Sequence, residues 1–500
     1  MCKSTNGRRK VVISGAGPAG LLCAALLLAR NNETDATVEY DVTLIDGLQD
    51  FGALSKEELA KSFRSWMLGL ATHGLDAIRE LPELYNNYVK GEGVELKEFN
   101  IYLGKKKFGQ TADDSGNVPE AFIVDRNFIV AAIARYVKEK HENDDHFTPM
   151  YRSTCQYVDY DNQRILVRNK ELKEETYVEY DLLIGCDGVR STVREALIKR
   201  HSDFSCSITD IFNNFKAVHV DRPKSISSEG MSLLPDMFPC FQGIALPETG
   251  GKVNISCGFP RHLMDEVDEE LKSDDYRIVA KYVKEKFKAF ELVDYDDFAK
   301  QWVGQRWNQT GMVHCNYYHS SQMNIVIMGD AAHATSPSIG MGMNTALRDA
   351  QEFCNILKEN KDDLSLTLPA FSEARVKEGN SLTSLANNLY CFNKKQQMIE
   401  TIHMIARSFF HKKFPSRVAN HPQNMIGVRG IMLSDVFDHA TKLRIIPKHR
   451  SINEKIRIEH FEKSCGMVKP CKTGSKARLI IGAVLAALAT ATYTRYTAIV

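Results

Sequence analysis

The sequence predicts an α/β fold in which a doubly wound, parallel-sheet domain is interleaved with a second domain of mixed or antiparallel sheet, ahead of a helical C-terminal region. Three observations predict this fold. A glycine-rich turn near residue 15 joins a short apolar run to a helical pattern, polar and apolar residues alternate over 94–108 and 215–260, and the chain after residue 344 is helical in pattern almost to its end. Five hundred residues exceed one ordinary core, so two or three subdomains are expected.

The glycine-rich turn has the form that binds the pyrophosphate of a dinucleotide. Gly15, Gly17 and Gly20 stand between a β-branched run and a helical pattern, which is the context that this motif requires. Gly15 allows the tight turn, Gly17 lets a pyrophosphate approach the backbone, and Gly20 lets the helix pack on the strand. With Ala19 in the same turn, the phosphates would lie at a helix N-terminus, where free N–H groups favour negative charge.

An acidic residue ends the second expected strand, residues 40–46. Asp46 stands where a carboxylate can accept both hydroxyls of an adenosine ribose. The usual distance from the glycines is about 20 residues, and the polar insertion at 31–37 lengthens it here. An aspartate that merely forms a turn at the strand end is the alternative interpretation.

Two further glycine–aspartate signatures follow the first in a fixed order. Asp187 closes the buried run 182–186, and Asp330 follows Gly329 before a second glycine-rich segment, 340–344. In this order the three signatures resemble those of the single-component, class A FAD-dependent aromatic hydroxylases.

The resemblance implies a Rossmann-type FAD-binding domain. Asp187 would belong to that family's DG motif, and Asp330, in its GD motif, would bond the flavin ribose. Backbone of the later segment would lie against the flavin ring at Gly342, Met343 and Asn344. Arg126, at the start of an expected helix, is a further cofactor contact.

The expected domain organisation follows from this family. The FAD-binding domain would comprise residues 1–75, 121–200 and 321–360, and the substrate domain residues 76–120 and 201–320. A helical C-terminal region would fill 361–478 and a membrane tail anchor 479–500.

Within the family, the kynurenine-hydroxylating members are the most similar, above all over 363–390. This similarity implies that Arg64 approaches the flavin and that Tyr390 and Asn344 contact the substrate. This chain departs from those members at Ser338, Ile339 and Met341 in the late glycine-rich segment, and at two positions expected near the substrate. Lys97 replaces an arginine that grips the substrate carboxylate, although a lysine on an alternating strand also suits a solvated face, and Glu120 replaces a tyrosine. Lysine keeps the charge but loses the bidentate fork.

Composition excludes some other classes. Basic and acidic side chains number 64 and 63, which gives no reason to expect nucleic acid as a partner. Twelve scattered cysteines and the lack of an apolar N-terminal signal indicate free thiols in a reducing compartment. The run 314–319, with its histidines and cysteine, could be imagined as a metal site but fits a strand and turn better, so no metal is expected.

The C-terminal tail contains an uncharged run, residues 479–494, with Lys472, Lys476 and Arg478 before it. The twenty-two residues to the end would span about 33 Å as a helix, close to a hydrocarbon core of about 30 Å. The basic flank predicts an anchor with the body facing the cytosol, on the mitochondrial outer membrane or endoplasmic reticulum. A buried or interfacial helix is the alternative.

The predicted reaction is the hydroxylation of an aromatic substrate, L-kynurenine or a related ring compound, with NAD(P)H and oxygen. Only one dinucleotide fingerprint is present, so NADPH or NADH would bind transiently. No side chain needs to act as a strong base, and His333 is expected to pack at a helix start, so no catalytic residue is assigned. A reductase or dehydrogenase on the same scaffold, and a noncatalytic FAD-containing membrane protein, are the alternatives.

Overall fold

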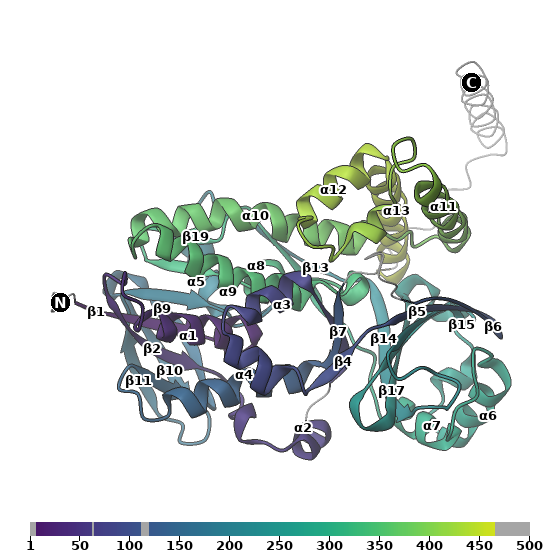
Figure 1. Ribbon diagram of the computed structural model, residues 1–500, viewed down its shortest axis with the longest axis horizontal. Coiled ribbons are helices and arrows are strands. Elements are labelled where there is room, and N and C mark those ends of the chain that lie inside the picture. The colour runs from purple at the N-terminus through teal and green to yellow at the C-terminus, as the bar shows by residue number, and fades with distance from the viewer. Residues whose placement is uncertain (1–6, 63–64, 112–119, 466–500) are drawn as a thin grey trace. The chain divides into compact units, whose positions relative to one another are not determined.

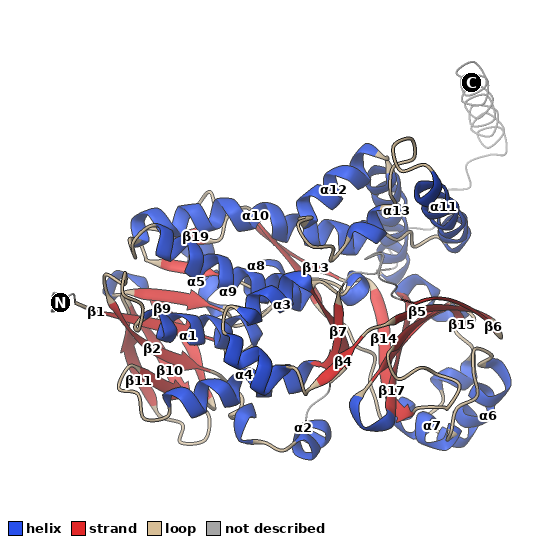
Figure 2. Cartoon of the chain, in the orientation of Figure 1, coloured by secondary structure: helices blue, strands red, loops and turns tan. Residues whose placement is uncertain are grey.

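The computed structural model describes residues 7–62, 65–111 and 120–465 (Figures 1 and 2). Residues Met1–Asn453 form one compact unit, and Glu454–Val500 form a second, which holds the end of the last described helix. The α/β fold class predicted from the sequence is confirmed, including the helical C-terminal region.

A six-stranded sheet forms the centre of the first hydrophobic core. Its strands run in the order β19-β20-β12-β1-β2-β8, and all neighbours are parallel except β19 and β20. The residues 11–13 of β1 are fully buried, because helices cover both faces of such a sheet. The strand bounds are β1 Arg8–Ser14, β2 Glu39–Ile45, β8 Phe147–Met150, β12 Leu182–Gly185, β19 His319–Ser320 and β20 Ile325–Ile327.

The helices around this sheet share its hydrophobic core. Apolar side chains of α1, α4, α5, α9 and α10 pack with the buried strands in one continuous cluster. These helices, with the short α8 that follows β20, span α1 Pro18–Arg30, α4 Arg126–His141, α5 Thr192–Arg200, α8 Asp330–His333, α9 Gly342–Glu359 and α10 Leu364–Asn388.

A second six-stranded sheet is mostly antiparallel, as the alternating pattern over 215–260 predicts. Its order is β14-β17-β16-β15-β5-β6, antiparallel except between β15 and β5. Two helices within 276–303, which the sequence analysis did not predict, build a separate core on it around the fully buried Trp302. The bounds are β5 Glu98–Leu103, β6 Lys106–Thr111, β14 Asn213–Asp221, β15 Gly230–Phe238, β16 Phe241–Pro247, β17 Lys252–Pro260, α6 Tyr276–Lys286 and α7 Tyr295–Val303.

Three small sheets complete the strands. One contains β3 Met67–Ala71, β7 Ala121–Asp125 and β4 Gly93–Glu95; another contains β9 Ser153–Asp159, β10 Arg164–Asn169 and β11 Glu175–Glu179; the third pairs β13 Cys206–Asp210 with β18 Gly311–Cys315. The run 314–319 therefore belongs to β18, a turn and β19, as expected. Before β4, α3 Thr72–Arg79 precedes a π-helical turn, Leu84–Val89.

The remaining helices are α2 Lys56–Ser62, α11 Lys394–Lys413, α12 Leu433–Lys442 and α13 Ile445–Ser464. A third core joins α10 to α12. In the described ranges, no helix combines the length and apolar character needed to cross a bilayer. The expected membrane tail, 479–500, lies outside the described residues.

A buried ionic network joins three of these helices. The Asp349 carboxylate on α9 accepts a hydrogen bond from the Gly329 backbone N–H (2.9 Å) and contacts His333 Nε2 (2.5 Å) and Arg375 Nε (2.7 Å). All three side chains are at least 97% buried. Burial alone would raise the pKa of Asp349, but the charges and hydrogen bonds of His333 and Arg375 lower it to about 2.

The Asp349→Asn variant should lose about 3–5 kcal/mol of unfolding free energy, because it leaves Arg375 buried without its charge partner. Urea unfolding near neutral pH would measure the loss, with Glu359→Gln, an exposed carboxylate on the same helix, as the control. Because the pKa of Asp349 is lowered on folding, its contribution is complete above its unfolded pKa, about 3.9, and declines as the pH falls toward 2. A variant as stable as the parent at neutral pH would contradict this role.

Candidate functional site

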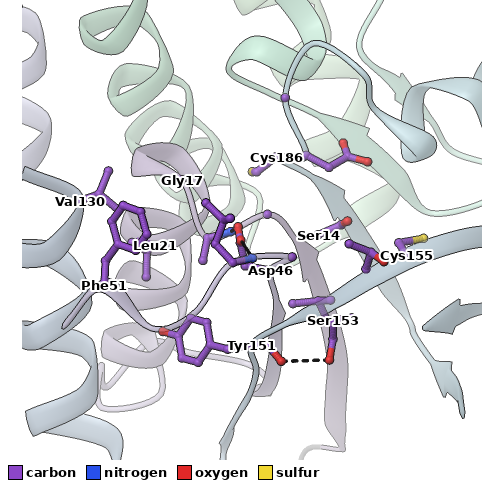
Figure 3. A pocket seen from close by; sticks show the side chains of 18 of the residues that line it. Ser14, Gly17, Leu21, Asp46, Phe51, Val130, Tyr151, Ser153, Cys155 and Cys186 are labelled. Atoms are coloured by element: carbon purple, nitrogen blue, oxygen red, sulfur yellow. Dashed lines mark hydrogen bonds between the residues drawn. The ribbon is translucent and has the colours of Figure 1, made fainter. Parts of the chain in front are cut away.

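A cavity of about 680 Å³ opens at the carboxyl ends of β1, β2 and β12 (Figure 3). This edge of a doubly wound sheet is where ligands of such folds bind. The segments that line it come from the β1–α1 turn, the end of β2, the start of α4, the start of β9 and the turn after β12; they include Ser14, Gly15, Ala16, Gly17, Asp46, Leu48, Arg126, Asn127, Tyr151, Ser153, Cys155, Cys186, Asp187 and Arg190.

The three fingerprint glycines occupy three different environments. Gly15 has a φ of +109°, and an added Cβ there would lie 2.2 Å from the Cys186 carbonyl oxygen. A Cβ on Gly20 would lie 1.9 Å from the Gly15 oxygen. Gly17, in contrast, lines the cavity and would place a Cβ in open space, with nothing within 4 Å. Gly15 and Gly20 therefore serve the fold, and Gly17 leaves room for a ligand.

The N-terminus of α1 faces the same cavity. Gly17 is the N-cap of this helix, no side chain caps it, and Pro18 is its first residue. The first turn carries no acidic side chain, so the positive end of the helix dipole is available to an anion. The turn is thus suited to a pyrophosphate.

Asp46 lies at the end of β2, on the cavity wall. One carboxylate oxygen accepts the Ala16 N–H and the other accepts the Leu48 N–H, each at 2.7 Å. The carboxylate is therefore held in place by the fingerprint turn itself. Each oxygen keeps a second lone pair, which a ribose hydroxyl can use.

Asp187 brings a buried carboxylate oxygen without a partner to the cavity. Its Oδ2 accepts the N–H groups of Thr192 (2.8 Å) and Val193 (3.2 Å), while Oδ1 is buried with no hydrogen-bond partner among the described residues. Burial raises the pKa of Asp187. An unsatisfied polar atom of this kind fits a bound ligand that carries hydroxyl groups.

Arg126 is the exposed first residue of α4 and also lines the cavity. Its guanidinium lies 5.1 Å from the ring centre of Trp66, and its backbone N–H donates to the Trp66 carbonyl. The indole thus orients the arginine next to the segment that contains Arg64. Arg64 itself lies outside the described residues.

The GD segment packs against the fingerprint helix. Gly329 has a φ of +60°, and a Cβ there would lie 3.5 Å from the Ala19 Cβ. Asp330, exposed, begins α8 directly after this turn. The Asp349 network holds the turn through the Gly329 N–H. Two motifs that are 310 residues apart thereby meet.

The predicted flavin-ring segment is fixed by one buried side chain. Gly342 begins α9, followed by Met343. Asn344 is fully buried; its Oδ1 accepts the Ala71 N–H (2.8 Å), and its Nδ2 donates to the carbonyls of Gly69 (2.8 Å) and Gly340 (3.0 Å). Both donors are in use, so the side chain positions this segment against β3.

The predicted substrate residues are not brought together at this cavity. Lys97 lies in the link between β4 and β5, not on a strand, and its Nζ pairs with Glu229 Oε1 (2.7 Å), directly before β15. Glu120 forms an ion pair with Arg79. The Tyr390 hydroxyl accepts a hydrogen bond from Gln423 (2.8 Å), beside the core that joins α10 and α12.

A pair of one histidine and one glutamate, at the junction of two sheets, was not predicted from the sequence. His219, on β14, contacts Glu248 through Nδ1 (2.7 Å) and the Ser65 carbonyl through Nε2 (3.4 Å). Burial opposes the charged form, but the hydrogen bond and charge of Glu248 raise the pKa of His219. No local pattern marks His219, because its partners are distant in sequence.

These features suit a dinucleotide, and a comparison with known proteins indicates which one. Residues 139–362 match the family model of the FAD binding domain, a range that contains Asp187 and Asp330. Gly17, the N-terminus of α1 and Asp187 Oδ1 fit a dinucleotide. The chain therefore carries a FAD-binding domain and its cofactor is FAD. It is similar to the FAD-dependent aromatic hydroxylases, which are monooxygenases.

Individual relatives are distant. Kynurenine 3-monooxygenase of Neurospora crassa is 25% identical over 418 residues, 77% of this chain and 78% of that protein. Violacein synthase of Chromobacterium violaceum is 25% identical over 268 residues, 53% of this chain, and the match spans only 61% of the length of that relative. The solved structure of 2-methyl-3-hydroxypyridine-5-carboxylic acid oxygenase shares the fold, with a TM-score of 0.58 and 16% identity over 86% of this chain and 98% of that one.

The Gly17→Ala variant should fold like the parent and lose FAD. Its methyl group meets no protein atom but occupies the space that a pyrophosphate needs, so we expect FAD affinity to fall at least about tenfold, or about 1.4 kcal/mol. Flavin absorbance per polypeptide and a FAD titration would measure this. Gly91→Ala, also in open space but away from the cavity, is the matched control, and full FAD retention by Gly17→Ala would contradict the assignment.

The Glu248→Gln variant should be less stable than the parent mainly at low pH. Because the pKa of His219 is raised on folding, the pair contributes fully below the unfolded histidine pKa of about 6.5, and the contribution is lost as the pH rises through the folded value. Urea unfolding at about pH 6 and about pH 9 tests this. Glu229→Gln removes an exposed partner of Lys97 and should change little at either pH. Equal losses for Glu248→Gln at both values would refute the charge pair.

Proposed function

We propose that the protein uses NADPH or NADH and molecular oxygen to hydroxylate an aromatic ring, and that the substrate is L-kynurenine or a related ring compound. The observation that carries this proposal is the FAD cavity, combined with a similarity to kynurenine 3-monooxygenase that extends over 77% of the chain. That similarity includes the helices after the GD segment, which no general need for FAD explains.

In this proposal each motif holds one part of the cofactor. The turn from Gly15 to Gly20 binds the pyrophosphate and Arg126 approaches from α4. Asp46 binds the adenosine ribose, and Asp330 binds the flavin ribose. FAD supplies the redox and oxygen chemistry when it is bound. The chain supplies position and a site from which water is excluded, so no side chain is assigned as a general base.

The nicotinamide cofactor binds transiently in this proposal. The sequence contains a single dinucleotide fingerprint, and the cavity that it builds belongs to FAD. A cofactor that reduces the flavin and leaves needs no second nucleotide-binding domain of its own.

Two of the residues at which this chain departs from the kynurenine-hydroxylating relatives have charged partners within the chain. Lys97 is paired with Glu229, so it would have to leave that partner to grip a carboxylate. Glu120 is neutralised by Arg79, which removes the repulsion that an unpaired glutamate would exert. Tyr390, which follows α10, remains the residue that we assign to the substrate side. Asn344 has the same assignment from the sequence, but its side chain is fully buried and bonded to the chain, so it would act by positioning α9 against β3.

Oxidation of NADPH and NADH and uptake of oxygen, each measured with and without L-kynurenine, would test the proposal. We expect kynurenine to accelerate both and 3-hydroxykynurenine to form. Oxygen uptake that yields only peroxide, unchanged by kynurenine, would indicate another ring substrate. Turnover without oxygen would indicate a reductase or dehydrogenase. Failure to oxidise either nicotinamide would favour the noncatalytic alternative.

We also propose that residues 479–500 attach the protein to a membrane with its body in the cytosol, at the mitochondrial outer membrane or endoplasmic reticulum. The support is the uncharged run from 479 to 494 behind Lys472, Lys476 and Arg478.

A further inference from the structure

Helix α11 (Lys394–Lys413) presents an apolar stripe to the outside of the protein. Met398, Ile402, Ile405 and Phe409 are each more than half exposed, at 63%, 59%, 51% and 54%. Their spacing of four, three and four residues places them on one face of the helix over about 16 Å. Ile399 and Phe410, also exposed, widen the stripe on one side. Monomeric soluble proteins rarely expose apolar groups so continuously.

The opposite face of α11 is polar and faces the protein. Gln397 accepts the Cys391 N–H, Glu400 accepts from Lys448, Ser408 accepts from Asn424, and His411 contacts the Val418 carbonyl. No residue of α11 is fully buried. The usual arrangement of an amphipathic helix is therefore inverted, since its polar side is bonded to the chain and its apolar side is left for another surface.

Basic side chains flank the stripe at both ends. Lys394 and Lys395 are exposed in the first turn, and Lys412 and Lys413 are exposed in the last. On a helix these four positions project to the same side as Ile402. The single acidic residue of α11, Glu400, is on the opposite side and paired with Lys448. The outer face is thus apolar in the middle and positive at both ends.

This charge pattern argues against a second copy of α11 as the occupant. In a parallel pair each lysine cluster would meet its own copy, and in an antiparallel pair the first cluster would meet the last. Both orientations bring like charges together. An anionic lipid surface suits both the apolar stripe and the lysines at its ends, because acidic headgroups lie directly above an apolar layer.

We propose that α11 is an interfacial helix that lies on an anionic lipid bilayer, with Met398, Ile402, Ile405 and Phe409 inserted below the headgroups and the four lysines among them. This contact is separate from the tail at 479–500, and it does not depend on the reaction that the flavin site catalyses. It would hold the helical C-terminal region against the membrane surface.

The test uses the full chain, in which the tail is kept in every variant. Phe409→Trp places a fluorophore on the stripe, and Leu172→Trp, at an exposed apolar position on a distant turn, is its control. Vesicles carry quenchers in the acyl chains and consist either of phosphatidylcholine alone or of equal parts phosphatidylcholine and phosphatidylserine. We expect quenching of Phe409→Trp above that of the parent only with the anionic vesicles, and none for Leu172→Trp.

Two further variants separate the apolar and the electrostatic contributions. Ile402→Asp in the Phe409→Trp background should remove the quenching, whereas Leu172→Asp should leave it. Lys412→Glu and Lys413→Glu should each weaken binding to anionic vesicles roughly fivefold or more, and added salt should weaken it further.

Several results would overturn the proposal. Anionic vesicles that capture the protein without quenching Phe409→Trp would show that another segment binds them. Equal quenching with neutral vesicles would contradict the role of the lysines. A parent that is dimeric by gel filtration, and that Ile402→Asp makes monomeric, would show that a second copy covers the stripe. FAD content, measured in every variant, would show that the fold is retained.

Discussion

The buried carboxylate of Asp349 is the contact on which the site depends most. It ties the N–H of Gly329, the ring of His333 and the guanidinium of Arg375 to one point inside the first core. Because the three come from the turn after β20, from α8 and from α10, their relative positions are fixed together. Low local dielectric strengthens these bonds and makes the loss of one partner costly. The GD turn therefore reaches the fingerprint helix in one defined position.

The cofactor site is built largely from close backbone approaches. Gly15 and Gly20 have no space for a side chain because Cys186 and the turn itself press against them, and this brings β12 and its Asp187 to the mouth of the β1–α1 turn. Asp46 then bonds the same turn through the Ala16 N–H. Of the three fingerprint glycines, Gly17 is the one that faces empty space. The turn is thus packed against Cys186 and bonded to Asp46, and its remaining side, at Gly17, is open to FAD.

The second six-stranded sheet has its own core, centred on Trp302, and a small apolar cluster that includes Met67, Ile123 and Leu246 joins this sheet to β3 and β7. Polar contacts lie in the same region. His219 reaches the Ser65 carbonyl, and the Ser65 hydroxyl donates to Asp125 at the start of α4 (2.6 Å). At the other extreme, α11 bonds to the chain through polar groups and leaves its apolar stripe uncovered. Exposure of apolar surface to water is unfavourable, and this drives the formation of the cores. For the same reason we expect another surface to cover the stripe on α11.

The sequence alone determined the elements whose causes are local. Turn chemistry marks Gly15, Gly17 and Gly20, and the buried runs before Asp46, Asp187 and Asp330 mark strands whose ends meet at one sheet edge. Alternation predicted the second sheet, but nothing local separated α6 and α7 from it. Only the tertiary structure decided which side chains are partners. Lys97 carries the same charge on any strand; packing placed Glu229, 132 residues away, beside it. In the sequence, nothing distinguishes Asp349 from other polar residues of a helix; its burial arises only where α8 and α10 pack around it. Predictions from local sequence use only residues that are near one another in the chain, whereas burial and the pairing of side chains depend on residues that are near one another in space.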